Sequence, residues 1–279
     1  MDATIPTVLV IAGSDSAGCS GIQADLRAVE ALGVHGLSVV TVVTARARRG
    51  LHKVDALRSE LVRAQLAAAA EGAVPRAVKI GALGNAAVVE IVADALRGLA
   101  DVPVVLDPVV TPRQGRALLD EAGFGAFVRE LVPAATLLVP NRDEAVRILG
   151  KPVATARQAR AACQALAAMG PRAVLLKGGH FDGAECVDTL WDGTAFTELR
   201  APRRELPPLQ GLGCALSSLT AAALALGATL PDAVRRAHAL VQEAVQRPRL
   251  LAPGLGTLGD LRDAVRALAL VAPGGNATT

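Results

Sequence analysis

Short apolar segments alternate with helix-period segments up to about residue 180, and no other feature of the sequence constrains the fold as strongly. The apolar segments are rich in Val, Ile and Leu on both faces, as are strands of a parallel sheet that helices cover. They lie at 7–13, 37–43, 76–81, 102–110, 135–140 and 172–179, with helical segments at 21–33, 58–71, 84–99, 115–131, 141–149 and 155–169. The sequence therefore predicts an α/β fold, an open and mostly parallel central sheet with helices on both faces.

The pattern changes beyond residue 180. Residues 186–199 predict a hairpin that turns at Asp192-Gly193. Three more helices are expected at 214–226, 231–244 and 257–271, and the tail from about residue 272 is expected to fray. No linker rich in Pro, Gly or Ser divides the chain, so residues 1–279 are expected to form one domain.

Composition excludes several classes of function. The chain is 52% hydrophobic with a formal charge of +3, which supports a large core and implies no acidic polymer or membrane surface as a partner. Only 2% of residues are aromatic, which argues against a nucleic-acid stacking platform. The four cysteines are far apart without a CxxC pair, so neither a disulfide framework nor a zinc site is indicated. With no targeting or membrane-spanning segment recognisable, we expect a cytoplasmic protein.

Polar and Gly-rich residues follow the predicted strands. The segments are AGSDSAGCSG, TARARRG, KIGALG, DPVV, PNRDE, KGGH and finally QGLGC. Because ligands bind beyond the carboxyl ends of the strands in open parallel sheets, these segments are expected to form one site.

The last of these segments precedes a helix with Gly211, Gly213 and Cys214. Free backbone N–H groups at a helix start carry partial positive charge and suit a phosphate, and glycine permits close approach. The same field would stabilise a thiolate on Cys214, which could then accept a hydroxyl proton. The alternative is a tight turn before an ordinary buried helix, with the cysteine as a small hydrophobe. The GxGC spacing by itself does not decide between them.

Four other polar residues also allow two interpretations. Asn141 and Glu144 could cap the helix that follows, or hold Mg²⁺ through water with their oxygen atoms. Lys177 could neutralise a transferring phosphoryl group or extend into solvent. Asp107 closes an apolar strand, where an unpaired carboxylate is costly, so a metal or hydrogen-bonding role is expected.

The complete set of motifs resembles one enzyme family. VLVIAGSDSAGCSGIQADLRAVEALGVHG, VKIGALG, VVLDPVV, LVPNRDEAVRILG, VLLKGGH and GLGC occur in the order and spacing of the hydroxymethylpyrimidine/phosphomethylpyrimidine kinases of thiamine biosynthesis. These kinases belong to the ribokinase-like superfamily, with pyridoxal kinases as relatives, and the resemblance covers about residues 5–250. It implies phosphorylation, dependent on ATP and Mg²⁺, of a hydroxymethyl group on a pyrimidine and of the resulting monophosphate. It also implies a homo-oligomer, expected to be a dimer.

The resemblance assigns residues to roles. The residues that it places around the pyrimidine are Gly13, Asp25, Arg46, Ala82 and Val109. The catalytic set is Gly211, Gly213, Lys177 and Cys214; Lys177, Asn141, Glu144 and Leu212 serve the nucleotide, and Asp107 and Glu144 the Mg²⁺.

The sequence departs from the family at this site. The usual Gly-Thr-Gly-Cys-Thr has Leu212 and Ala215 in place of the two threonines, so two hydroxyl donors are lost. A His-Gly that commonly precedes becomes Gln210-Gly211, and Cys19 replaces a glycine of the first loop. Arg46 stands where a glutamine reads the pyrimidine edge, and a guanidinium cannot supply the amide's acceptor.

Three functions fit this pattern. The first is an active kinase in which Arg46 favours an anionic substrate such as a phosphorylated pyrimidine, unless it turns to solvent with Arg48 and Arg49. The second is a nearly inactive relative that binds a small ligand or a partner. The third is a pyridoxal-type kinase with altered substrate. Retention of the metal and base positions together favours an active kinase.

Overall fold

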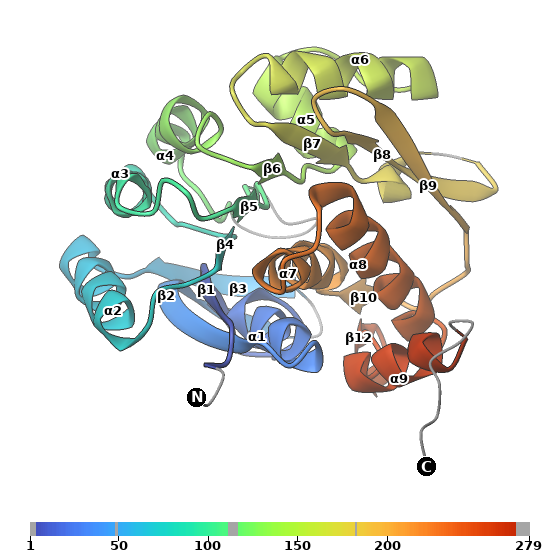
Figure 1. Ribbon diagram of the computed structural model, residues 1–279, viewed down its shortest axis with the longest axis horizontal. Coiled ribbons are helices and arrows are strands. Elements are labelled where there is room, and N and C mark those ends of the chain that lie inside the picture. The colour runs from blue at the N-terminus through green and yellow to red at the C-terminus, as the bar shows by residue number, and fades with distance from the viewer. Residues whose placement is uncertain (1–3, 48–49, 111–116, 182, 272–279) are drawn as a thin grey trace.

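The computed structural model describes residues 4–47, 50–110, 117–181 and 183–271, and within them the chain forms a large central sheet (Figure 1). The sheet has nine strands in the order β3-β2-β1-β4-β5-β6-β7-β8-β9. The strands are β1 Thr7–Asp15, β2 His35–Ala47, β3 Gly50–Ala56, β4 Ala77–Ile80, β5 Val104–Leu106, β6 Leu137–Leu138, β7 Ala173–Leu176, β8 Glu185–Trp191 and β9 Phe196–Pro202. The six central strands, β2, β1, β4, β5, β6 and β7 in sheet order, pair in parallel. On the two sides, β3 pairs antiparallel with β2 and β8 pairs antiparallel with β7. The predicted mostly parallel sheet is confirmed.

Side chains alternate between the two faces of this sheet, and both faces are apolar. On β1, Leu9 and Ile11 join one hydrophobic core, while Val8 and Val10 join the other. All four are at most 5% exposed. Burying a side chain of this size stabilises the fold by roughly 1.5–3 kcal/mol, so a strand that is apolar on both faces holds two helical layers.

Helices cover both faces, as predicted (Figure 1). One layer packs on the core of Leu9 and Ile11 and consists of α2 Ser59–Gly72, α3 Ala86–Arg97, α4 Glu121–Ala126 with the π-helical turn Phe127–Leu131, α5 Arg142–Leu149 and α6 Ala156–Ala167. The other layer consists of α1 Gly21–Ala31, α7 Leu212–Ala225, α8 Leu230–Ala244 and α9 Leu261–Val271. Helix α7 is central in this layer, and most of its residues from Ala215 onward are buried.

The structure corrects several predicted boundaries. The strand expected at 102–110 ends at Leu106, because Pro108 has no N–H for a sheet hydrogen bond. The helix expected at 115–131 has its N-cap at Asp120, whose side chain accepts from the amide of Gly123. Residues 115–116, like the tail from residue 272, lie outside the described residues. The hairpin predicted around Asp192-Gly193 is confirmed as β8–β9.

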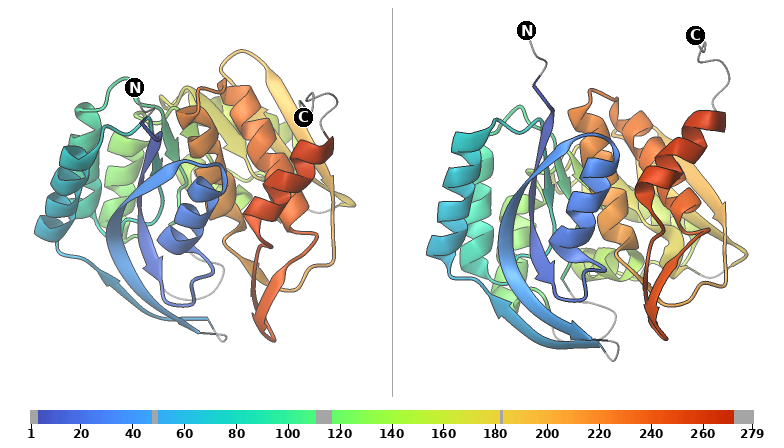
Figure 2. Two further views of the ribbon diagram at one scale, coloured as in Figure 1. Left: turned by 60° about the horizontal axis from the view of Figure 1, so that its bottom comes forward. Right: turned by 90° about the horizontal axis from the view of Figure 1, so that it is seen from below.

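Two parts of the β structure were not predicted. One is the pairing of β3 with an extended β2, and the other is a small sheet of β10 Leu209–Gln210, β12 Leu255–Thr257 and β11 Arg249–Ala252. Because β12 occupies residues 255–257, the last helix starts at Leu261 instead of residue 257. Figure 2 shows β2–β3 and β11–β12 projecting at the same end of the molecule, the end to which the carboxyl terminus of β1 points.

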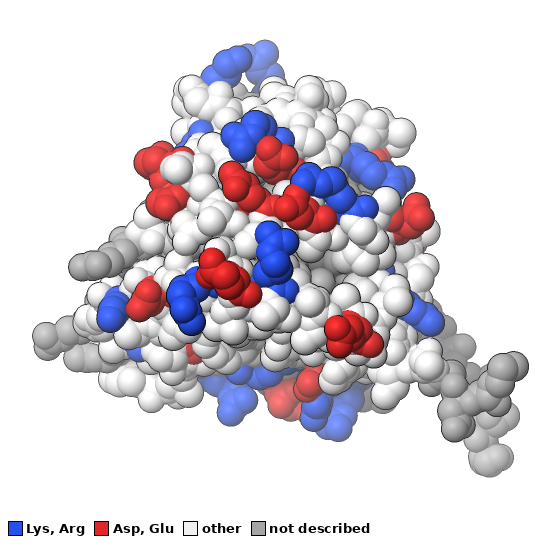
Figure 3. All heavy atoms as spheres, turned by 90° about the vertical axis from the view of Figure 1, so that its left-hand side faces the viewer, with Lys and Arg blue, Asp and Glu red and all other residues white. Residues whose placement is uncertain are grey.

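The surface carries both signs of charge. Figure 3 shows Lys and Arg interspersed with Asp and Glu on the side that bears α2 and α3. Among the helices of the described residues, none is both long enough and apolar enough to cross a bilayer.

Candidate active site

Three neighbouring strands end in polar residues that meet at one edge of the sheet. Asp107, Asn141 and Lys177 follow β5, β6 and β7, and Asn141 forms an isolated parallel bridge with Lys177. The Nζ atom of Lys177 donates to Oδ1 of Asp107 at 2.8 Å and lies 3.7 Å from Oε2 of Glu144. The structure thus brings together the four residues that were expected to serve the phosphates and the metal.

The capping interpretation of Asn141 and Glu144 holds in its full form. The side chain of Asn141 accepts from the amide of Glu144 at 2.9 Å, and Oε2 of Glu144 accepts from the amide of Asn141 at 2.7 Å. This capping box fixes the carboxylate of Glu144 beside Lys177. Burial raises the pKa of Glu144 to about 7, Lys177 acts to lower it, and Asp107 adds to the increase. Capping and a role in the site are therefore compatible.

Lys177 carries its charge in this setting. Burial alone would lower the pKa of its ammonium, but Asp107 and Glu144 raise it overall. Its side chain is still 16% exposed, so a ligand can reach it. When Glu144 is ionised, one cation between two carboxylates leaves the cluster with a net negative charge, which suits a divalent metal that arrives with phosphates.

The first turn of α7 faces this cluster. Gly211 is the N-cap with φ of 81°, and a Cβ there would lie 2.2 Å from the carbonyl oxygen of Cys19, so only glycine fits. A Cβ on Gly213 would lie 3.3 Å from Nζ of Lys177 and 3.8 Å from Oδ2 of Asp107. One turn on, the hydroxyl of Ser217 lies 3.5 Å from Oδ2 of Asp107. The helix start therefore opens onto the ion pair, as an anion cradle requires.

Cys214 lies in this turn and is half-buried. Burial raises the pKa of its thiol to about 12; Lys79 acts to lower it, whereas Asp25 and Asp107 raise it. A hydrogen bond from the backbone of Gly21, the first residue of α1, also acts to lower it. This differs from the expected thiolate stabilisation by the helix start, because the loss of solvation exceeds the favourable field.

The two residues that replace threonines point into the core. Ala215 is 2% exposed, and Leu212 packs against the core beneath α1, α7 and α8. Leu212 was expected at the nucleotide, and its apolar side chain contributes core packing while its backbone belongs to the cradle. The backbone donors of the helix start survive both changes.

An apolar group lies beside the cradle, at the ends of β1 and β4. Ala82 and Val109, both expected at the pyrimidine, share a hydrophobic cluster with Leu51 and Leu118. A Cβ on Gly13 would lie 3.5 Å from the Cβ of Ala82. Sequence reasoning missed Leu51, because β3 was not predicted, and Leu118, because it fell within the helix expected at 115–131.

Arg46 is held at this site and does not turn to solvent. Its Nε atom is 3.4 Å from Oδ1 of Asp15, and its side chain is 10% exposed. The hydroxyl of Ser16 accepts from the backbone amide of Arg46 at 2.8 Å. Nε is buried without a hydrogen-bond acceptor at good distance. The neighbours Arg48 and Arg49 lie outside the described residues.

Asp25, which was expected at the pyrimidine, lies elsewhere. It is fully buried, and its carboxylate accepts from Nζ of Lys79 and from the hydroxyl of Ser218. Its placement argues against direct contact with a substrate.

The donor set fits a metal that keeps most of its ligands from phosphate and water. Within the described part of the chain, no group of three or more His, Cys, Asp and Glu side chains could hold a metal ion. Asp107 and Glu144 offer two carboxylates, which is the small number that Mg²⁺ uses beside nucleotide phosphates.

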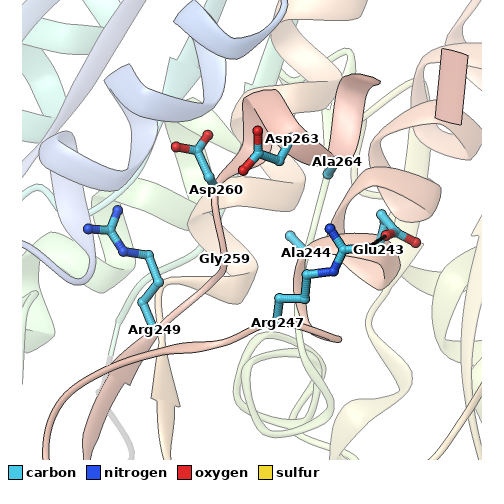
Figure 4. Close-up of a pocket in the computed structure, with 8 residues that line it drawn as sticks. All are labelled: Glu243, Ala244, Arg247, Arg249, Gly259, Asp260, Asp263 and Ala264. Atoms are coloured by element: carbon cyan, nitrogen blue, oxygen red, sulfur yellow. Dashed lines mark ion pairs between the residues drawn. The ribbon is translucent and has the colours of Figure 1, made fainter. Parts of the chain in front are cut away.

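A separate hollow of about 370 Å³ lies between the end of α8 and the start of α9 (Figure 4). Its charged side chains are Glu243, Arg247, Arg249, Asp260 and Asp263. Both acidic and basic side chains line it, and Arg247 pairs with Glu243 at 3.8 Å. It does not include the residues at the strand ends, so it is not part of the candidate site.

Comparison with known proteins finds similarity to kinases. Residues 15–258 match the phosphomethylpyrimidine kinase family. A hydroxymethylpyrimidine/phosphomethylpyrimidine kinase of Streptomyces coelicolor is 43% identical over 91% of this chain and 93% of its own length. The phosphomethylpyrimidine kinase of Clostridium difficile is 33% identical, with a TM-score of 0.76 over 87% of this chain and all of its own. The ADP complex of Bacillus subtilis pyridoxal kinase is 29% identical, with a TM-score of 0.85 over 95% of this chain and all of its own.

Proposed function

The chain belongs to the phosphomethylpyrimidine kinase family, and we propose that its strand-end cluster and the start of α7 form the phosphoryl-transfer site. The protein is a phosphotransferase of thiamine biosynthesis that phosphorylates hydroxymethylpyrimidine, its monophosphate or both with ATP. The observation that carries the site assignment is the convergence of Lys177, Asp107 and the first turn of α7.

Each part of the site has a task in this reaction. Lys177 and the backbone N–H groups of residues 211–214 neutralise charge on the transferring phosphoryl group. Asp107 and Glu144 would hold Mg²⁺, which would supply positive charge to the nucleotide phosphates. The apolar group of Ala82, Val109, Leu51 and Leu118 packs against the substrate ring, with Gly13 leaving room for it.

Cys214 is assigned as the base. The O–H bond of the substrate hydroxyl breaks, its proton goes to Sγ of Cys214, and the hydroxyl oxygen bonds to the γ-phosphorus of ATP. The bond between that phosphorus and ADP breaks, and ADP leaves. Because the pKa of the thiol is about 12, the thiolate is a minor form at neutral pH and depends on positive charge nearby.

The experiment measures ADP release by purified protein with Mg²⁺-ATP and hydroxymethylpyrimidine, its monophosphate or pyridoxal. We expect turnover with the pyrimidines. Cys214→Ala should lower kcat by about 10²–10⁴-fold, the usual range for a general base. Cys186→Ala is the matched control, since Cys186 pairs with Ala201 in the β8–β9 hairpin and is not among the residues assigned to the site.

Three results would change the proposal. Turnover with pyridoxal alone would favour the pyridoxal-type kinase, and no turnover in folded protein would favour a ligand-binding relative. Undiminished turnover in Cys214→Ala would remove that residue as the base. The expected dimer and cytoplasmic location stay predictions, and light scattering tests the first.

A further inference from the structure

An ion pair with no solvent exposure lies directly below the candidate site. Lys79 on β4 and Asp25 on α1 are both 0% exposed, and Nζ of Lys79 contacts the two carboxylate oxygens at 2.9 and 2.8 Å. Such a pair adds little net stability compared with well-packed apolar residues, because both charges lose their hydration. Its presence under a polar site calls for another explanation.

The pair is linked to the helix that carries Cys214. The hydroxyl of Ser218 donates to Oδ1 of Asp25 at 2.8 Å. Ser218 follows Cys214 by four residues on α7, so the two side chains share one face of the helix. The ammonium of Lys79 also reaches to 2.9 Å from where a Cβ on Gly81 would lie, at the carboxyl end of β4. The positive charge therefore sits between the end of β4 and the turn of α7 that carries Ser218.

Charge interactions connect Cys214 to both members of the pair. The ammonium of Lys79 favours the thiolate and the carboxylate of Asp25 disfavours it. Burial by itself would lower the pKa of Lys79, but Asp25, Cys214 and Asp107 raise it overall, so Lys79 stays charged. The other charged groups that act on Cys214 are Asp107 on the β5 side and Lys177 on the β7 side.

We propose that Lys79 is a positioning residue of the phosphoryl-transfer site: its ammonium, fixed by Asp25, stabilises the thiolate of Cys214 and so controls how readily that thiol accepts the substrate proton. The inference rests on the proposed role of Cys214 as the base. It identifies the fixed positive charge that opposes the effect of burial on the Cys214 thiol. It also gives Asp25 a task that needs no contact with substrate.

The test measures the rate at which iodoacetamide alkylates Cys214, resolved by peptide mass spectrometry between pH 8 and 9.5. Below the pKa of the thiol this rate follows the thiolate fraction, so each unit of pKa changes it about tenfold. We expect Lys79→Met to slow alkylation of Cys214 by about tenfold or more. Asp25→Asn should accelerate it, because the removed charge has the opposite sign. Alkylation of Cys186 in the same samples is the internal control.

Lys79→Met leaves a carboxyl group buried without its partner and can reduce folding yield. The neutral double variant Asp25→Asn/Lys79→Met keeps a group that can pair with Ser218, and circular dichroism confirms that it is folded. Its Cys214 should react at least about tenfold more slowly than that of Asp25→Asn. A change of the same sign in both single variants, or a double variant that reacts as fast as Asp25→Asn, would overturn the proposal.

Turnover separates this inference from the role of Cys214. If both hold, kcat falls together with the alkylation rate in Lys79→Met relative to wild type and in the double variant relative to Asp25→Asn, while the KM for ATP stays within about twofold. If alkylation shifts and kcat does not, Lys79 controls the thiol but Cys214 is not the base. If kcat falls and alkylation does not, Lys79 acts on something other than the thiol, and the inference is wrong.

Discussion

The two ends of the candidate site consist of different kinds of chemical groups. The phosphoryl end consists of charged side chains at the ends of β5, β6 and β7 and of the backbone at the start of α7. The ring end consists of small and apolar side chains and Arg46, and it includes strand β3 at the edge of the sheet. Residues of the phosphoryl end contact one another, as Glu144 contacts Asn141 and Lys177 contacts Asp107.

This difference indicates which substitutions each end of the site tolerates. At the phosphoryl end, the groups that face the ligand are backbone N–H groups and an ion pair. Leu212 and Ala215 can therefore replace threonines without removing these groups, because their own side chains pack on the core. At the ring end, each side chain is itself the contact surface, and a substitution such as Arg46 changes the recognition directly. Mutations at the two ends should therefore differ in kind: loss of rate at one, change of substrate at the other.

The largest effect is expected from Lys177→Met. The variant leaves Asp107 and Glu144 without their shared cation and removes charge neutralisation from the transferring group. We expect kcat to fall by about 10²–10³-fold, the range for loss of one stabilising donor in a transition state. Lys151→Met, an exposed lysine after α5, is the control and should keep wild-type rates. A kcat within about threefold of wild type would place the phosphoryl end elsewhere.

A smaller loss is expected from Gly213→Ala. The added methyl group would lie 3.3 Å from Nζ of Lys177, in the space over which the phosphoryl group must approach the backbone. We expect kcat/KM to fall about 10- to 100-fold with little change in stability, since a misplaced group can cost about that much. Gly125→Ala is the matched control, because a Cβ there meets nothing within 4 Å and alanine favours its helix by up to about 1 kcal/mol. Equal activities of the two variants would show that the cradle does not contact the phosphoryl group.

The sequence predicted the phosphoryl end far better than the ring end. Asp107, Asn141 and Lys177 each follow an apolar run that hydrophobic pattern alone identifies as a buried strand, and parallel strands bring their ends together. The edge strand β3 has no such pattern, because only Leu51 is buried in a run of half-exposed and exposed residues. Leu51 was missed for this reason, whereas Leu118 fell within the helix expected at 115–131 and lies before the observed helix.

The pKa of Cys214 at the helix start could not be predicted from the sequence either. The field of a helix terminus is a local property, whereas burial of Cys214 and its distance from Lys79 depend on how α7 packs on β4 and α1. Asp25 was misplaced for the same reason. Its position one turn into α1 was compatible with a side chain that faces either a ligand or solvent. In the structure its carboxylate pairs with the buried Lys79.

Arg46→Gln tests the ring end, with the smallest expected effect. An amide offers both a donor and an acceptor to the ring edge, whereas the guanidinium offers donors alone, so the variant gains about one hydrogen bond. The gain should lower the KM for hydroxymethylpyrimidine and for its monophosphate by a similar factor of roughly tenfold, because both share the ring. Asp15 tolerates the loss of Arg46, since its carboxylate also accepts from Ala17 and from the backbone and hydroxyl of Ser20.

The ratio of the two KM values decides between two accounts of Arg46. The ion pair with Asp15 compensates its charge, so we expect no preference for an anionic substrate and an unchanged ratio. A KM that rises for the monophosphate alone would show that Arg46 selects anions, and would assign charge recognition to the ring end as well. Arg76→Gln, at an exposed position before β4, is the control for the general effect of removing a positive charge and should leave both KM values unchanged.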